Sequence, residues 1–231
     1  MAEVPSASKT SARRAQKKRE KEMKLTAITP GMNRFQWNLR YPGATEVRGF
    51  NPPIAAGGLE DSVAGPVVVP GRYHVMLDYG GAKSTQTFAV TLDPRLHASS
   101  AALRARLALE LKIHTALNTL DRTINQAMTV RDQLRTAMDT HRLPQDQAAP
   151  AIAGLDRAIH ALVQMAIQSS EGSLVHETKL RSHLAYLAAD IDLAYVRPTA
   201  AQYAVFRYLE RKAARGEQRL ESAMARGRKL L

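Results

Sequence analysis

The 231-residue sequence has no cysteine, one tryptophan and only 5% aromatic residues. Without cysteine the chain cannot form disulfide bridges, thiol nucleophiles, zinc ribbons or iron–sulfur clusters. The glycine patterns of P-loops and dinucleotide-binding folds are missing, as are the GxSxG and HExxH motifs of hydrolases. The seven histidines include no HxH pair. We therefore expect no cofactor, no metal site and no catalytic constellation.

Long apolar stretches are missing as well. No run of about 20 apolar residues occurs, so the sequence predicts no membrane span. The start of the chain lacks the apolar core of a secretory signal, which predicts a cytoplasmic protein for the sequence as it stands. Apolar residues nevertheless make up 45% of the chain, which is enough for the core of one large domain or two small ones.

Positive charge is in excess, with a net charge of +12 and a pI near 10.2. Eight basic residues stand from Lys9 to Lys24 against two acidic ones, in a segment that we name the basic arm (residues 1–28). One interpretation is a nucleic-acid contact, because clustered lysine and arginine bind phosphate. The other is a solvated, disordered or partly helical tail, and the arm has no aromatic residue to stack on bases. The residues assigned to phosphate contact are Arg13, Arg14, Lys17, Lys18, Arg19 and Lys21.

The segment after the arm has the two-residue periodicity of β-strands. Large apolar residues alternate with polar ones over 33–41, which predicts a first strand. Two further alternating runs, 72–79 and 84–92, flank the turn glycines Gly80 and Gly81 and predict a hairpin. Residues 44–66 are rich in Gly, Ala and Pro and are predicted to form a long loop across one end. The motif residues of the first strand are Asn33, Arg34, Phe35, Trp37, Leu39 and Tyr41.

Together these strands predict a small antiparallel β-sandwich of the immunoglobulin type over residues 29–95. The aromatic residues of the strands then belong to its core, although they could also line a carbohydrate platform. From about residue 99 the apolar residues recur every three or four positions, which is typical of amphipathic helices.

Four helices are predicted, at about 99–140, 148–167, 180–194 and 199–230. Ser99 or Ser100 and Thr199 are expected N-caps. Amphipathic helices bury their apolar faces against one another, so residues 98–231 are predicted to form an antiparallel four-helix bundle. Small residues in the last helix predict a close helix crossing: Ala213, Gly216, Ala223 and Gly227. The expected fold class is α+β, with two folded domains.

Four motifs resemble one protein family. They are GMNRFQWNLRYP (31–42), VPGRYHV (69–75), VTLDPR (90–95) and RPTAAQYAVF (197–206). As a set they resemble the C-terminal region of bacterial proteins with a sortilin-like (VPS10/BNR-repeat) β-propeller, which are often labelled glycosyl hydrolases and are often exported. The resemblance covers roughly residues 30–230 and implies a β-sandwich followed by a helical segment.

The resemblance also has a gap. The family's sandwich begins with a further strand before the GMNRF motif, and here the basic arm stands at that place. The resemblance therefore implies a sheet edge without its usual neighbour, which favours association with another chain. The chain has no propeller blades and no Asp-box repeats, so no activity of the propeller is carried over to its residues.

These observations lead to three hypotheses of function. The main one is a non-catalytic accessory or interaction module that packs against a propeller or another protein chain, including a truncated or split gene product. The rival is a nucleic-acid-binding protein that uses the basic arm. A third is a part of a glycoside hydrolase, which would need a pair of carboxylates in a cleft that the sequence does not reveal.

Overall fold

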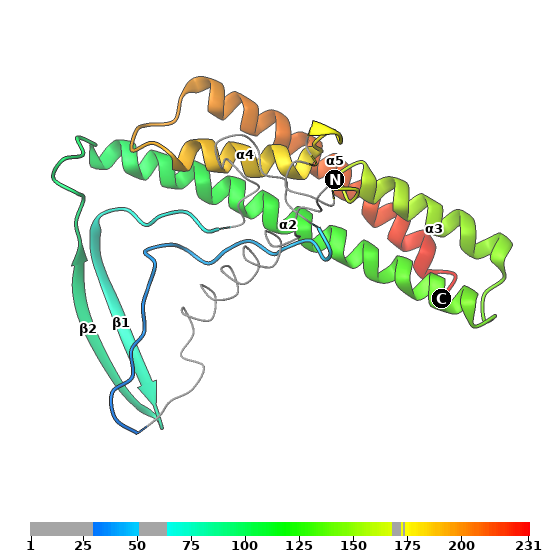
Figure 1. Ribbon diagram of the computed structural model, residues 1–231, viewed down its shortest axis with the longest axis horizontal. Helices are drawn as coiled ribbons and strands as arrows, with labels where there is room; N and C mark the ends of the chain where they lie inside the picture. Colours follow the sequence, from blue (N-terminus) through cyan, green and yellow to red (C-terminus); the bar gives the residue numbers. More distant parts are fainter. Residues whose placement is uncertain (1–29, 51–63, 168–171, 173) are drawn as a thin grey trace, which may run out of the picture. The chain divides into compact units, whose positions relative to one another are not determined.

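The computed structural model of the chain describes residues 30–50, 64–167, 172 and 174–231. Two compact units are distinguished, Met1–Arg40 and Tyr41–Leu231. The described residues of the second unit form a pair of strands and four helices, which confirms the predicted α+β class (Figure 1). In chain order these elements are β1 (Gly71–Tyr79), β2 (Ala82–Val90), α2 (Ser100–Asp139), α3 (Gln145–His160), α4 (Leu180–Asp192) and α5 (Ala200–Arg228).

The first and last of these helices, α2 and α5, begin at predicted N-caps. The Ser99 hydroxyl accepts a hydrogen bond from the Ala102 amide at 3.1 Å. The Thr199 hydroxyl accepts one from the Gln202 amide at 3.2 Å, and the Gln202 side chain accepts one from the Thr199 amide at 2.8 Å. Such bonds satisfy amide groups that have no partner inside the helix, so the local sequence sets both starting points.

The second helix, α3, differs at both ends from the prediction. It begins at Gln145, directly after Pro144, and includes Pro150 near its start. It ends at His160, seven residues before the predicted end. The apolar residues beyond this end are still buried, so the apolar pattern marks contact with the core and not a continuous helix. These residues are Leu162, Val163 and Ile167.

The contacts between the helices define the order and direction in which they pack. Both α2 and α5 contact all three other helices, whereas α3 and α4 do not contact each other. Arg131 and Arg135 in the second half of α2 bind Asp156 of α3. Arg106 in the first half of α2 binds the carbonyl of Ala194, just beyond the end of α4. Thus α3 and then α4 run back along α2, one after the other (Figure 1).

The last helix, α5, runs in the same direction as α2. Near its end, a Cβ added at Gly227 would lie 3.1 Å from methyl carbons of Leu134 and Val130, which are in the second half of α2. A Cβ at Gly216 would collide with the Leu162 side chain. At Gly227 a larger residue would push α5 away from α2, whereas at Gly216 it would press on the chain after α3. The four predicted helices are confirmed, but a four-helix bundle is not, since α3 and α4 together fill one place beside α2 and α5.

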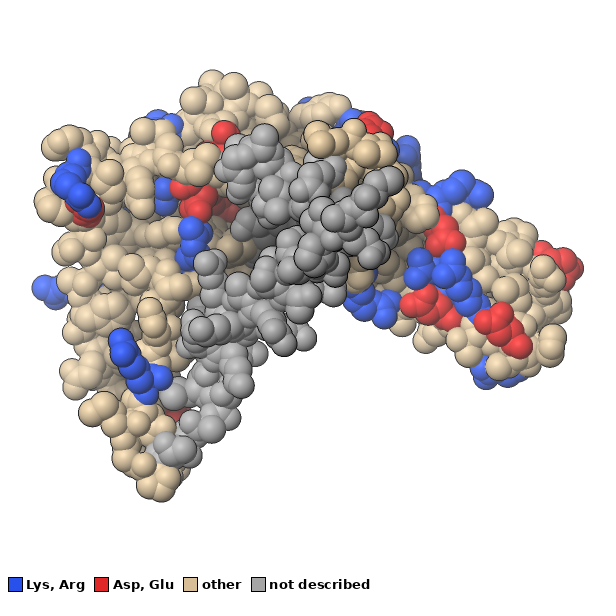
Figure 2. All heavy atoms as spheres, in the orientation of Figure 1, with Lys and Arg blue, Asp and Glu red and all other residues tan. Residues whose placement is uncertain are grey.

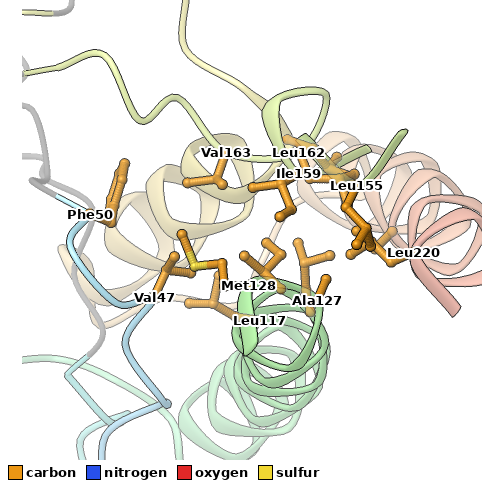
Figure 3. Packing of buried hydrophobic residues seen from close by; sticks show 14 of the residues in the cluster. Val47, Phe50, Leu117, Ala127, Met128, Leu155, Ile159, Leu162, Val163 and Leu220 are labelled. Atoms are coloured by element: carbon orange, nitrogen blue, oxygen red, sulfur yellow. The ribbon is translucent and has the colours of Figure 1, made fainter. Parts of the chain in front are cut away.

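One apolar core joins the four helices. Its residues come from every helix and from the chain that leads into α4. Figure 3 shows fourteen of them. Side chains with no exposed area include Ile113, Leu117, Leu120, Ile124, Leu134, Leu155, Ile159, Leu184 and Leu220. Burial on this scale supplies the main driving force for folding of the helical part.

Part of the predicted long loop is instead a segment that docks on α2. Residues 44–50, which we name the strap, run along α2 and place Val47 and Phe50 in the core at 3% and 9% exposure (Figure 3). Residues 44–50 form no helix or strand, as the predicted loop requires, but the structure places them on α2. Residues 51–63 of that prediction lie outside the described part of the chain.

The predicted strand over 33–41 is not present. Leu39 has a φ of 59°, in the left-handed region, and this interrupts the extended run. The Trp37 indole N–H donates to the Arg40 carbonyl at 3.0 Å, a local bond. Phe35 is 49% exposed. Alternation assigns side chains to faces but supplies no neighbouring strand, so the described residues contain a two-stranded sheet and the β-sandwich is not confirmed.

Candidate functional site

The β1–β2 hairpin has two chemically different faces. The strands pair antiparallel from Gly71 with Val90 to Tyr79 with Ala82, and residues opposite each other share a face. The turn between them is Gly80-Gly81, with φ of 57° and 86°, as the predicted hairpin requires. One face carries charged and hydroxyl side chains together with Met76. The other, which we name the apolar hairpin face, consists of Tyr73, Val75, Leu77, Tyr79, Phe88 and Val90 with three small or polar residues of β2.

The apolar hairpin face is exposed toward the turn. Val75 is 50% exposed, Leu77 59% and Tyr79 65%. Neither strand contacts any of the four helices, and each contacts only the other strand among these elements. In Figure 2 the surface over β1 and β2, at the lower left, is mostly uncharged. Exposed contiguous apolar side chains of this kind mark interaction surfaces.

One end of the apolar hairpin face is ordered by its own contacts. The rings of Tyr73 and Phe88 stack with their centroids 6.1 Å apart. The Tyr73 hydroxyl donates to the Val69 carbonyl at 2.6 Å. Partial burial raises the pKa of Tyr73 above its ordinary value, with a smaller contribution from Tyr41. The hairpin therefore presents side chains held by contacts at this end and exposed side chains toward the turn.

Two asparagines of α2 hold the strap by its backbone. The Asn118 side-chain oxygen accepts hydrogen bonds from the Thr45 amide at 3.0 Å and hydroxyl at 2.7 Å. The Asn125 oxygen accepts from the Arg48 amide at 2.8 Å, while its NH₂ group donates to the Glu46 carbonyl at 2.8 Å. The two asparagines are seven residues apart and so lie on the same side of α2. Their side chains supply hydrogen bonds to backbone amide and carbonyl groups of the strap, which a neighbouring strand would supply in a sheet.

A buried ion pair lies close to the strap. The Arg181 guanidinium, in the first turn of α4, contacts the Asp121 carboxylate of α2 with nitrogen–oxygen distances of 3.1 to 3.2 Å. Both side chains are at most 2% exposed. The guanidinium also lies 4.6 Å from the centre of the Phe50 ring. The strap therefore helps to enclose the charged pair.

Burial changes the proton affinity of both partners. Burial raises the pKa of the Asp121 carboxyl, and the negative charge of Glu46 raises it further. Burial lowers the pKa of Arg181, while Glu46 acts in the opposite direction. In each case the low-polarity surroundings disfavour the charged form. Each charge is therefore stabilised by its partner. Removal of one partner leaves the other buried without an opposite charge, which lowers the stability of the fold.

A second buried pair lies at the other end of α4. Arg106 and Glu110 of α2 are each 2% exposed, with 3.7 Å between Nε and Oε2. Arg106 donates to the Ala194 carbonyl at 3.1 Å, and its guanidinium lies 5.0 Å from the centre of the Tyr195 ring. Positive charge is favourable at the C-terminus of a helix, where carbonyl groups lack partners. Charged groups of α2 thus hold α4 at both ends.

The residues predicted to carry function have different outcomes. The six basic-arm residues lie outside the described part of the chain, so phosphate contact by the arm stays a prediction. Asn33 donates to the Gly31 carbonyl at 3.3 Å, and Arg34 is exposed. Leu39 and Tyr41 are 39% and 38% exposed, so these side chains are not the sandwich core that the alternation predicts.

The described ranges contain no group of three or more His, Asp or Glu side chains that could hold a metal ion. None of the helices described in the structure is long and apolar enough to cross a membrane.

Sequence reasoning missed the buried ion pairs and the strap. For the ion pairs a signal exists, because Arg106, Glu110 and Asp121 stand inside the apolar stripe of α2, one turn from buried apolar neighbours. Charged residues are almost never fully buried without a partner, so such positions can be singled out. For Asn118 and Asn125 there is no comparable signal, since polar residues on a helix side normally face water.

Comparisons with protein-family models, with curated proteins and with solved structures find no match for this chain.

Proposed function

We propose that this chain is a non-catalytic interaction module whose β1–β2 hairpin joins a sheet of another protein chain. The exposed apolar hairpin face carries the proposal. An isolated two-stranded hairpin is marginally stable in water, whereas three or more strands with a covered apolar face are stable. A partner that covers Val75, Leu77 and Tyr79 therefore adds burial that the described residues do not supply.

The partner that fits is a β-rich protein with an apolar sheet surface and an available strand. Full burial of a Val or Leu side chain is worth about 1.5 to 3 kcal/mol, and part of this is available at each of these side chains. An incoming strand can extend this two-stranded sheet through backbone hydrogen bonds at one of its edges. On this proposal the β-sandwich forms with the partner's strands.

The resemblance to sortilin-like proteins supports the same partner class. In that family the corresponding region follows a β-propeller, and we propose that this chain is related to it and binds a propeller or a similar sheet. The proposal assigns no reaction to the chain. The two buried carboxylates of α2 that were described above, Asp121 and Glu110, lie against arginines and suit a structural role.

Site-specific photocrosslinking in the source cells tests the proposal. Leu77 is replaced by p-benzoylphenylalanine, and Thr85, which lies on the opposite face of the hairpin, is replaced in a matched control. We expect irradiation to link the Leu77 variant, and not the Thr85 variant, to a second polypeptide that mass spectrometry identifies as β-rich.

Two results would contradict the proposal. One is equal crosslinking from both faces, which would mean that contact is not specific to the apolar hairpin face. The other is crosslinking of position 77 only to residues of the same chain, which would mean that the chain covers its own hairpin.

A further inference from the structure

An open groove lies between α3 and α5. Its volume is about 600 Å³, and its lining includes four arginines: Arg157 of α3 and Arg215, Arg219 and Arg226 of α5. The remaining lining residues are glycine, alanine, serine and glutamine, so no carboxylate lines it. We name it the arginine groove. All four arginine side chains are exposed.

The charges of the arginine groove are not balanced by the helix that carries them. On an α-helix, side chains three and four positions apart are neighbours. At these positions from Arg215, Arg219 and Arg226 stand only basic, small or uncharged residues, and Arg211 extends the basic row by one turn. Like charges four residues apart destabilise a helix by a few tenths of a kcal/mol. The three glutamates of α5 stand at other positions: Glu210, Glu217 and Glu221.

The contact between α2 and α3 provides a comparison, because its arginines are paired with carboxylates. There Arg131 and Arg135 of α2 bind Asp156 at 3.2 and 2.9 Å, and Arg131 also binds Asp132 at 2.8 Å. In contrast, none of the four groove arginines has an ion pair or a side-chain hydrogen bond with any residue that the structure describes. Positive charge is therefore concentrated in the arginine groove, and no carboxylate of the described residues balances it.

The groove favours phosphate groups in a row. Arginine binds phosphate through two parallel N–H donors, which makes it the preferred side chain for such contacts. Along α5, Arg215 and Arg219 are about 6 Å apart and Arg226 lies about 16 Å from Arg215, at 1.5 Å per residue. The ligand must therefore be long, with negative charges spread over a similar length.

The lining also indicates which part of a nucleic acid is bound. Proteins that bind single strands stack the bases on aromatic side chains, and no aromatic residue lines the arginine groove. In a duplex the bases are already stacked and the phosphates face outward. We propose that the arginine groove binds the phosphate backbone of double-stranded nucleic acid without reading its sequence. This site is separate from the basic arm, and it does not depend on the proposed function of the hairpin.

Salt-dependent binding of the full chain to a 20-base-pair DNA duplex, followed by fluorescence anisotropy, tests the proposal. The groove variant carries Arg215→Gln and Arg219→Gln, which remove two phosphate contacts and leave helix propensity nearly unchanged. We expect affinity to fall by about tenfold or more, and the slope of log K against log salt to fall by about 1.8. Arg157→Gln, on the other helix, should lower the slope by about 0.9 and keeps the test independent of α5.

The matched control is Arg72→Gln with Arg104→Gln, on β1 and α2 and away from the basic row of α5. Both arginines are exposed and lie outside the groove, so the same net charge is lost and affinity should change less than about threefold. A second comparison uses Lys17→Gln with Lys18→Gln in the basic arm. Circular dichroism of each variant checks that the helices are intact.

The proposal is overturned by any of four results. These are no binding of the duplex by the unaltered chain, equal losses in the groove and control variants, a loss confined to the arm variant, and equally tight binding of a single strand of the same length. The last result would mean that any linear polyanion suffices.

Discussion

The hairpin and the helices follow the same patterning rule, but their apolar faces differ in exposure to solvent. In both, apolar residues recur with the period of the secondary structure and form one face. In the helices that face is covered, and Leu120 of α2 has no exposed area. In the hairpin it is open, and Leu77 of β1 is 59% exposed. A pattern therefore identifies the side chains that share a face, but it does not say whether the same chain covers them.

The difference lies in the number of partners within the chain. Each helix has at least two neighbouring helices, and α2 also receives the strap. The hairpin consists of two strands that contact only each other among the helices and strands of the described residues. We infer that the helical part is stable by itself, whereas the hairpin is the part that depends on a partner. Three further predictions test this comparison.

The largest effect is expected in the buried ion pair. Asp121→Leu leaves the Arg181 guanidinium buried without this carboxylate, and Arg181→Met leaves the carboxylate without the guanidinium, so each should lower the free energy of unfolding by about 3 to 5 kcal/mol. The double variant should lose much less than the sum, because it buries no uncompensated charge. Urea unfolding followed by circular dichroism measures all three. Additive losses would show that the two residues act independently.

A smaller effect is expected at the strap. Asn125→Ala removes two hydrogen bonds to the strap backbone and should lower the free energy of unfolding by about 1 to 3 kcal/mol. Hydrogen exchange should also speed up at residues 44–50. The control is Thr115→Ala, since the Thr115 hydroxyl binds a carbonyl of its own helix. Unchanged exchange in the strap would mean that Val47 and Phe50 hold it without the asparagine.

The smallest effect on stability is expected in the hairpin. Leu77→Thr should change the free energy of unfolding of the isolated chain by less than about 0.5 kcal/mol, because this side chain is exposed and threonine suits a strand. In comparison, Leu120→Ala should cost about 2 to 5 kcal/mol. Both values come from the same urea experiment. A loss of 2 kcal/mol or more at Leu77 would mean that the hairpin is packed within the chain.

The helical part was largely predictable. The caps at Ser99 and Thr199 and the apolar stripes have local causes, and these local signals are strong in long helices. The same signals could not separate α3 from the buried residues after it, because Leu162 and Val163 contact the core without being helical.

The β part was predictable only where a short turn sequence fixes the backbone. Gly80-Gly81 sets the turn of the hairpin through two positive φ angles, and the alternation of β1 and β2 is confirmed. The strand predicted over 33–41 had alternating residues but no turn sequence that pairs it with a neighbour. A strand forms only where another backbone supplies its hydrogen bonds. The resemblance to a sandwich family supplied an expectation that the described strands do not confirm.

Of the two candidate surfaces, one could be predicted from the sequence and the other could not. The apolar hairpin face could be read from the sequence, because the register follows from the turn. The arginine groove could not, because it combines Arg157 of α3 with arginines of α5 that stand about 60 residues later. The α5 sequence alone shows a basic row, which is typical of any solvated helix face.

The sequence by itself thus determined the apolar stripes of the helices, the turn of the hairpin and the caps at Ser99 and Thr199, since these depend on neighbours within a few residues. The tertiary structure decided that the strap lies on α2, that α3 and α4 share one place, and that charges of α2 and α4 meet inside the core. These features depend on side chains such as Asp121 and Arg181, 60 residues apart. Burial removes the water that would otherwise hydrogen-bond to such charged groups. Only side chains that the packed chain brings together can replace those hydrogen bonds.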